Sequence, residues 1–197
     1  MSPRTEEQFE EIREERKELI LQTGLELFAT KGYHNVSVSD IARAADISKG
    51  LMYNYFESKE VLLSSVVQKG IKDLLEAFDR DKDGVLTKDE LSYFIDFIFL
   101  SLKNNKQFWR LYFMLIMQPE IYEMVKNEYM SLKERVIKTT YAFFEERGYE
   151  DPECEILIFA AMLDGLAFQF VFADDNFQYP LEKLRDKVYK IYGLKKQ

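Results

Sequence analysis

The chain has 197 residues, 47% of them hydrophobic and 15% aromatic, which is enough to bury a core in one domain or two small ones. Its formal net charge of −8 excludes nucleic-acid binding through bulk charge, so any DNA-binding surface must be local. A single cysteine, Cys154, excludes a disulfide framework within the chain and favours a reducing cytoplasm. The charged N-terminus lacks the apolar core of a signal peptide, and apolar runs such as residues 156–163 are shorter than a membrane span, so we expect a soluble cytoplasmic protein.

The first predicted element is a helix that ends near Lys31. The first dozen residues are polar and expected to be loose. Residues 5–18 hold seven glutamates and form either a solvated helix face or a frayed arm. Gly32 is the expected C-terminal cap of this helix. The apolar residues of the helix fit one buried stripe, made of Leu19, Ile20, Leu25, Leu27 and Phe28.

Three further helices follow, each preceded by a residue that can cap it. Ser37 or Ser39 precedes a short helix, and after a tight turn Ser48 precedes the short helix KGLMYNYF. Ser58 precedes a longer helix that runs to about Phe78. Two short helices joined by a tight turn and packed on a longer one are typical of a helix-turn-helix unit, whose second helix enters the DNA major groove.

The rest of the chain also shows helical periodicity, and the whole contains only four prolines and eight glycines. Proline and glycine separate the predicted helices, which occupy residues 88–103, 105–117, 119–147, 152–174 and 180–193. The sequence therefore predicts an all-α fold. Residues 1–58 would form a helix-turn-helix DNA-binding domain, and residues 59–197 a helical domain for effector binding and dimerisation.

Residues 24–63 closely resemble the signature of the TetR family of repressors. The similar segments are LELFATKGY, SVSDIARAADIS, KGLMYNYF and SKEVLL. The resemblance implies contacts with a double-stranded DNA operator from Ser37, Ser48, Lys49, Gly50, Tyr53, Asn54, Tyr55 and Lys59. Lys49 would reach a base edge or a phosphate, and Gly50 would let the backbone approach the DNA. Tyr53 is a groove contact or a core residue, Phe56 is expected in the core, and Tyr55 and Lys59 would contact phosphates.

Two features depart from the family pattern. Asp46 occupies a turn position at which the family usually has glycine, but aspartate tolerates the left-handed conformation that the turn requires. Residues 31–59 carry four basic and three acidic side chains, so nonspecific DNA affinity should be modest and sensitive to salt. His34 either approaches the DNA backbone, as the resemblance implies, or lies in a solvated loop.

The segment DRDKDGVLTKDE, residues 79–90, has the full spacing of an EF-hand calcium loop. Acidic residues occupy its first, third and fifth positions, Gly84 is sixth and a glutamate is twelfth. Calcium prefers about six to eight hard oxygen ligands. The predicted ligands are Asp79, Asp81, Asp83, the backbone carbonyl of Val85, Thr87 and Glu90. The alternative is a solvated acidic turn in which aspartate and glycine act only as turn formers.

Apolar residues on both sides of this loop have helical spacing, as a helix–loop–helix calcium site requires. They are Ile71, Leu74, Leu75 and Phe78 before the loop and Leu91, Phe94, Ile95 and Ile98 after it. Leu86 is the apolar loop residue expected to point into the core. Because no second loop of this kind occurs in the chain, the hand would be unpaired and should bind calcium weakly.

Residues 105–177 are rich in aromatic residues and methionine, most of which must be ordinary core. Family resemblance favours a small apolar effector, with Trp109, Tyr112, Phe113, Met162 and Phe168 as candidate contacts. The helices at 152–174 and 180–193 are the expected surface of a homodimer. Asp164 either contacts a ligand or serves as a polar group in helix packing.

These features predict a homodimeric transcriptional regulator, a repressor by resemblance, that binds a pseudo-palindromic operator and responds to a small apolar ligand and to calcium. The alternative is a calcium-binding interaction protein that no longer binds DNA. An enzyme is not expected, because one histidine and one cysteine form no catalytic constellation and no glycine-rich phosphate loop is present.

Overall fold

The computed structural model describes residues 6–174 and 176–195, without the side chains of residues 6, 7, 71, 73, 127–129, 131–133 and 135. Helices fill most of this part of the chain and no strand occurs in it, which confirms the all-α fold. The α-helices are α1 (Glu6–Lys31), α2 (Val38–Ala44), α3 (Lys49–Tyr55), α4 (Lys59–Phe78), α5 (Lys88–Asn104), α6 (Lys106–Ile116), α7 (Pro119–Glu145), α8 (Pro152–Phe172) and α9 (Leu181–Ile191). A 3-10 turn, η1, covers Tyr33–Asn35.

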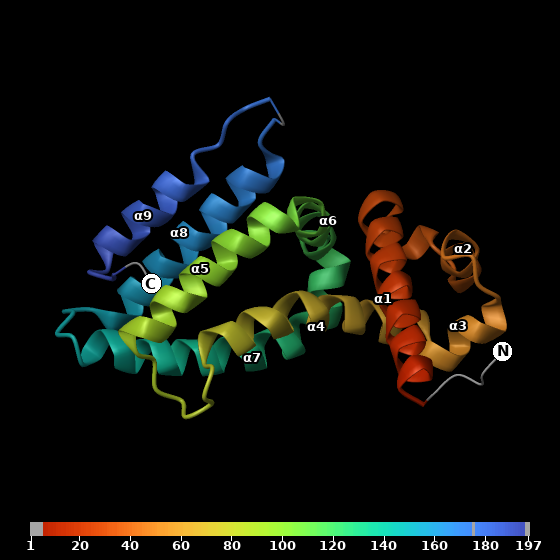
Figure 1. The fold of residues 1–197 in the computed structure, drawn as a ribbon, viewed down its shortest axis with the longest axis horizontal. Coiled ribbons are helices and arrows are strands. Elements are labelled where there is room, and N and C mark those ends of the chain that lie inside the picture. The colour runs from red at the N-terminus through yellow and green to blue at the C-terminus, as the bar shows by residue number, and fades with distance from the viewer. Residues whose placement is uncertain (1–5, 175, 196–197) are drawn as a thin grey trace.

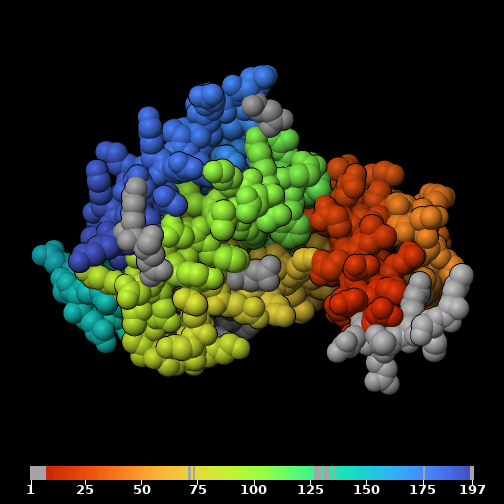
Figure 2. All heavy atoms as spheres, in the orientation of Figure 1, coloured from red at the N-terminus to blue at the C-terminus, as the bar shows by residue number. Residues whose placement is uncertain are grey.

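The helices form an elongated molecule with α2 and α3 at one end and α8 and α9 toward the other (Figure 1). α6 lies between α1 and α5, and α4 runs from the helix-turn-helix end to the loop of residues 79–87 (Figure 1). This loop projects at the lower edge of the molecule, on the surface that faces the viewer (Figure 2).

Local sequence signals set most helix ends. The side chains of Ser37, Ser48 and Ser58 each accept a hydrogen bond from a backbone N–H in the first turn of α2, α3 and α4. Of the two serines proposed to cap α2, Ser37 is therefore the cap. Gly32 follows α1, as predicted, with φ 81°, a backbone conformation that favours glycine. Asp46 has φ 53° and so adopts the left-handed conformation expected of the turn.

The first helix begins earlier than the sequence suggested. α1 already starts at Glu6, so most of the residues expected to be loose are helical and the glutamates form a solvated helix face rather than a frayed arm. The predicted buried stripe is also wrong at Leu19, which is 44% exposed, whereas Ile20, Leu25 and Phe28 are buried. Apolar character alone therefore did not ensure burial at this position.

One hydrophobic core crosses the predicted domain boundary at residue 58. This cluster contains α1 residues such as Phe28 and α3 residues such as Met52, together with Leu62 and Leu63 of α4. Leu111 and Leu115 of α6 belong to the same cluster. The helix-turn-helix unit therefore shares one core with the helices that follow it, and the packing does not separate the two predicted domains at residue 58.

α8 carries a long apolar surface that is largely exposed. Over an 18-residue window its mean hydropathy is 1.8 and only 28% of the window is buried, so its length and composition would allow it to cross a membrane. The eight-residue run at 156–163 lies within this longer apolar helix, so run length was the wrong criterion. One such helix is weak evidence for a membrane span, because core and interface helices meet the same criteria. Its exposed apolar side chains include Leu157, Ile158, Phe168 and Phe172.

Gly70 is the point at which α6 packs directly on the backbone of α4. A Cβ atom at Gly70 would lie 2.3 Å from the Tyr112 ring, a separation that van der Waals repulsion forbids. The Tyr112 hydroxyl also donates a hydrogen bond to the Val67 carbonyl at 3.3 Å. The absence of a side chain at Gly70 is therefore what lets this ring lie against α4.

We expect Gly70→Ala to lower the free energy of unfolding by about 2 kcal/mol, because overpacking outweighs the roughly 1 kcal/mol that alanine gains in a helix. Gly50→Ala is the matched control, since a Cβ there would meet only the Ser48 hydroxyl, at 4.0 Å. Urea unfolding followed by circular dichroism measures both. Equal stability of the two variants would show that Tyr112 moves aside at little cost.

Candidate functional site

α3 has two distinct faces. Met52 and Phe56, four residues apart, are buried in the first core. Lys49, Gly50, Tyr53 and Asn54 are exposed, and Tyr53 is 44% exposed, which excludes its assignment to the core. Tyr55 is half-buried against the same core. α3 lies at the outer end of the molecule (Figure 1), so its exposed face is open to a large partner.

The hydroxyl of Ser37 is engaged within the protein. It donates to the Asp40 carboxylate at 2.6 Å and accepts from the Asp40 backbone N–H at 3.2 Å, which completes a capping box at the start of α2. The Ser37 hydroxyl and the Ser37 backbone N–H both donate to the Asp40 carboxylate and lower its pKa. Asp40 also pairs with Arg43 at 2.5 Å, so this arginine is partly neutralised. Ser48 is exposed, and its hydroxyl caps α3.

Lys59 points inward, which the sequence did not indicate. Its ammonium donates to the carbonyls of Tyr33 and Val36, both at 3.0 Å, and lies 4.1 Å from the centre of the Tyr33 ring. The Tyr33 hydroxyl donates to Glu60 at 2.9 Å. Burial and this hydrogen bond raise the pKa of Tyr33. Lys59 therefore joins η1 to the start of α4 whether or not it also reaches a phosphate.

Cationic groups are sparse around α3. Lys49 is exposed and forms no ion pair with a carboxylate in the described part of the chain, whereas Arg43 is paired with Asp40. His34 is exposed, with its ring edge-on to the Tyr33 ring at a centre-to-centre distance of 5.3 Å. This position fits both a solvated loop histidine and one that approaches the DNA backbone. Residues 31–59 thus have a nearly even charge balance, and one of their basic side chains, Arg43, is also paired with Asp40.

The loop of residues 79–90 brings three of its carboxylates together. Asp79, Asp81 and Asp83 each place one carboxylate oxygen within 4.8 Å of the others. Gly84 has φ 77°, in agreement with the sharp turn expected at the sixth position. Leu86 is buried, as predicted, in a second core that also contains Phe78 and Leu91.

The apolar stripes that flank the loop are largely as predicted. Ile95 is buried, while Phe94 and Ile98 are half-buried against the core. Leu74 and Leu75 are half-buried. The side chain of Ile71 lies outside the described residues.

Glu90 does not point into the loop with the other carboxylates. Its Oε2 accepts from the backbone N–H of Thr87 at 3.0 Å and from the Thr87 hydroxyl at 2.8 Å, while the Thr87 hydroxyl accepts from the Glu90 N–H. This is a capping box at the start of α5. Val85 donates its backbone N–H to Asp83 at 2.7 Å. All the predicted ligands therefore lie in one loop, but in this structure the Glu90 side chain caps α5.

Three of the five candidate effector contacts, Trp109, Tyr112 and Phe113, belong to one aromatic cluster. Trp109 and Tyr112 are buried, with ring centres 5.6 Å apart, and Trp109 donates its indole N–H to Ser101 of α5 at 2.9 Å. Phe113 contacts Phe168, at a ring separation of 6.0 Å.

Met162, the fifth candidate, lies apart from these rings and packs on the second core. Asp164 is exposed on α8. A crevice bounded by the two helices that flank the acidic loop is lined by none of the five candidates.

Comparison with known proteins identifies the family. A family model described as "Bacterial regulatory proteins, tetR family" matches residues 20–66. YwcC of Bacillus subtilis (strain 168), named as an uncharacterized HTH-type transcriptional regulator, is 30% identical over 176 residues, which cover 82% of this chain and 78% of YwcC. The chain belongs to the TetR family. As a TetR-family protein it is a DNA-binding transcriptional regulator, and the names of its relatives point to a regulator rather than an enzyme.

Two other comparisons show which parts of this TetR-family chain are shared. YuxN of Bacillus subtilis (strain 168) is 53% identical over 53 residues, which span 27% of this chain and only 18% of YuxN. A solved transcriptional regulator from Saccharomonospora viridis in complex with choline has a TM-score of 0.61 at 19% identity, covering 91% of this chain and 96% of that one. The first match is a local one, and the second shows the fold alone.

We expect Lys59→Ala to lower the free energy of unfolding by about 1–3 kcal/mol, because it removes the two charge-assisted hydrogen bonds to the Tyr33 and Val36 carbonyls. Lys49→Ala, which removes an exposed lysine from the same unit, should change stability by less than about 0.5 kcal/mol. Chemical denaturation of both variants provides the comparison. If the two lose the same stability, the internal hydrogen bonds of Lys59 contribute little.

Proposed function

We propose that this TetR-family protein is a homodimeric repressor that reads a pseudo-palindromic operator with the exposed face of α3. The observation that carries this proposal is the division of α3 into a buried face at Met52 and Phe56 and an exposed face at Lys49, Gly50, Tyr53 and Asn54. A recognition helix needs this division, since one face anchors it and the other meets base edges. The rival interpretation, an interaction protein that has lost DNA binding, is not favoured by relatives named as transcriptional regulators.

Within the reading unit, Tyr53 and Asn54 are proposed to contact bases, and Lys49 a base edge or phosphate. Tyr55 and Ser48 are proposed to contact phosphates. Such contacts would position the protein on the DNA without reading its sequence. Ser37 would reach a phosphate only if its hydroxyl left the Asp40 capping box. Half-sites about one helical turn apart would suit a two-fold dimer.

Gly50→Ala should weaken operator binding by about tenfold, or about 1.4 kcal/mol, without loss of stability. The added methyl group meets open space within the protein, so the only close neighbour it can disturb is the DNA. An operator selected from a random duplex library with the unaltered protein supplies the probe for fluorescence anisotropy.

Two measurements complete this test. The unfolding midpoint of Gly50→Ala serves as the control for folding, and Tyr55→Phe should weaken binding to all sequences alike. Unchanged operator affinity in Gly50→Ala would place the DNA contact elsewhere on the protein.

The homodimer is proposed to form through α8 and α9. The apolar side chains exposed on α8, such as Leu157 and Ile158, would be buried by the same face of a second copy, as in an isologous interface. This pairing also accounts for the apolar character of α8 without a membrane.

Control by a small organic effector is proposed at the aromatic cluster of Trp109, Tyr112 and Phe113. The cluster links α5 to α4 through the Trp109–Ser101 and Tyr112–Val67 hydrogen bonds, so a ligand that separated these rings would move helices of both halves. The Saccharomonospora viridis regulator bound to choline supports the idea that this fold holds small molecules.

Calcium is proposed to bind the loop of residues 79–90 and to fix the angle between α4 and α5. The convergence of Asp79, Asp81 and Asp83 supports the proposal, because three nearby carboxylates repel one another until a divalent cation compensates them. Glu90, Thr87 and the Val85 carbonyl would complete the oxygen shell, which requires Glu90 to leave its capping box.

Glu90→Gln should lower calcium affinity by more than about tenfold, since it replaces a charged bidentate ligand with a neutral one. Isothermal titration with calcium gives the affinity, and anisotropy with calcium or chelator gives the operator response. We expect the unaltered protein to respond and the variant not to respond.

Asp89→Asn is the matched control for this substitution, because it removes a neighbouring exposed charge that is not at a ligand position. Calcium binding without any change in operator affinity would make the ion a structural element only.

A further inference from the structure

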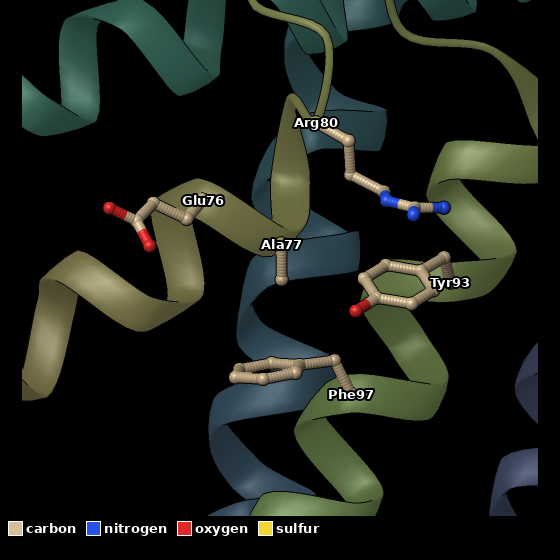
Figure 3. Close-up of a pocket in the computed structure, with 5 residues that line it drawn as sticks. All are labelled: Glu76, Ala77, Arg80, Tyr93 and Phe97. Carbon is tan, nitrogen blue, oxygen red and sulfur yellow. The ribbon is translucent and has the colours of Figure 1, made fainter.

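A crevice of about 300 Å³ lies between the two helices that flank the acidic loop. It is lined by Glu76 and Ala77 of α4, by Arg80 in the loop, and by Tyr93 and Phe97 of α5 (Figure 3). Its volume is at the lower end of the range for small-molecule sites, and it is open to solvent on one side. None of the five effector contacts predicted from the sequence lines it.

The polar groups that face this crevice are hydrogen-bond donors. The Arg80 guanidinium stacks on the Tyr93 ring, 4.2 Å from its centre, and neither side chain has a hydrogen bond or ion pair with another described residue. Figure 3 shows the Arg80 side chain reaching toward α5 and the Tyr93 hydroxyl directed toward the space between Ala77 and Phe97. An arginine that lies flat on a ring keeps its edge N–H groups available in one plane.

The negative lining residue faces away from these donors. Glu76 turns its carboxylate to the far side of α4 from Tyr93 (Figure 3) and lies 3.9 Å from the Lys72 ammonium. Ala77 is buried and Phe97 half-buried, so the remaining wall between the donors is apolar. The crevice therefore combines a cationic planar group, a hydroxyl and an aromatic wall.

We propose that this crevice binds a small planar aromatic carboxylate. The carboxylate would accept hydrogen bonds from Arg80, and also from the Tyr93 hydroxyl, while the ring packs against Phe97 and Ala77. Arginine is well suited to a carboxylate because its N–H groups can form two parallel, charge-assisted hydrogen bonds. A neutral aromatic amide would retain the ring contact but lose the charge, and an aromatic ammonium ion would be repelled.

The charge of the acidic loop affects how tightly an anion can bind in this crevice. Asp79 and Asp81 are the chain neighbours of Arg80, so their charges oppose the approach of an anion. Calcium in the loop would compensate those charges, and binding of the two ligands would then be mutually favourable. This part of the inference rests on the proposed calcium site, whereas the carboxylate site does not.

Isothermal titration with 2-naphthoate provides the test, with 2-naphthamide and 2-naphthylmethylammonium as matched probes. We expect a dissociation constant for 2-naphthoate on the order of 100 µM, as suits a small ligand in an open crevice. The amide should bind about tenfold more weakly, and the ammonium ion should not bind measurably.

Arg80→Gln should weaken 2-naphthoate binding by about tenfold or more, and Tyr93→Ala should also weaken it. Arg147→Gln is the control, because the Arg147 guanidinium likewise lies over a ring, that of Phe143 at 3.6 Å, but this residue follows α7 and does not line the crevice. Circular dichroism melting checks that each variant folds. Absence of 2-naphthoate binding both with calcium and with chelator would overturn the proposal, as would loss of binding in Phe113→Ala combined with full binding in Arg80→Gln.

The same titrations in calcium and in chelator test the electrostatic link. We expect binding to be about three- to tenfold tighter in calcium, and Glu90→Gln to abolish this difference. If a separate calcium titration shows no binding, the proposed calcium site fails while the carboxylate site stands on the chelator data. If calcium binds and the 2-naphthoate affinity does not change, the link itself is wrong.

Discussion

The contact between the Tyr112 ring and the backbone of Gly70 fixes α6 on α4, and much of the remaining packing depends on it. α6 carries Leu111 and Leu115 into the core that surrounds α1 and α3, so the same helix that touches α4 also supports the DNA-reading unit. On its other side, Trp109 of α6 donates a hydrogen bond to Ser101 of α5. One short helix therefore joins the first helix, the helix that leads into the acidic loop, and the helix that leaves it.

This arrangement explains how two distant regions can influence each other without a separate signalling element. α4 begins directly after its cap Ser58, beside α3, and ends at Phe78, just before Asp79, the first residue of the acidic loop. Its first half lies in the core of the reading unit and its last turn in the second core, with Phe78. Because α4 is one continuous helix packed in both cores, a displacement of α4 in one core also displaces it in the other. A ligand at the loop or at α6 changes operator affinity only to the extent that it favours one position of α4 over another.

The sequence predicted those features that local chemistry decides. Serine caps, a glycine after α1, a left-handed Asp46 and prolines at helix starts each act within a few residues, and the helix ends lie close to their predicted places. The sequence could not show that Lys59 bonds to carbonyl groups 26 and 23 residues away, because that depends on how η1 packs on α4. The role of Glu90 as a helix cap was hidden for a different reason, since a glutamate at that position fits both a capping box and a calcium loop. The crevice beside Arg80 depends on the relative placement of two helices, which periodicity does not encode.

The two roles open to Glu90 set the physical terms of any response to calcium. In this conformation its carboxylate stabilises the start of α5, and loss of such a cap typically costs about 1 kcal/mol. A cation that recruited Glu90 would have to offset that cost as well as the ordering of the loop. The gain comes from the mutual repulsion of Asp79, Asp81 and Asp83, which is relieved only when the positive charge is present. The cap and a bound cation would compete for the same carboxylate, so calcium would shift the start of α5 only by the difference between its affinities for the capped and the uncapped arrangement.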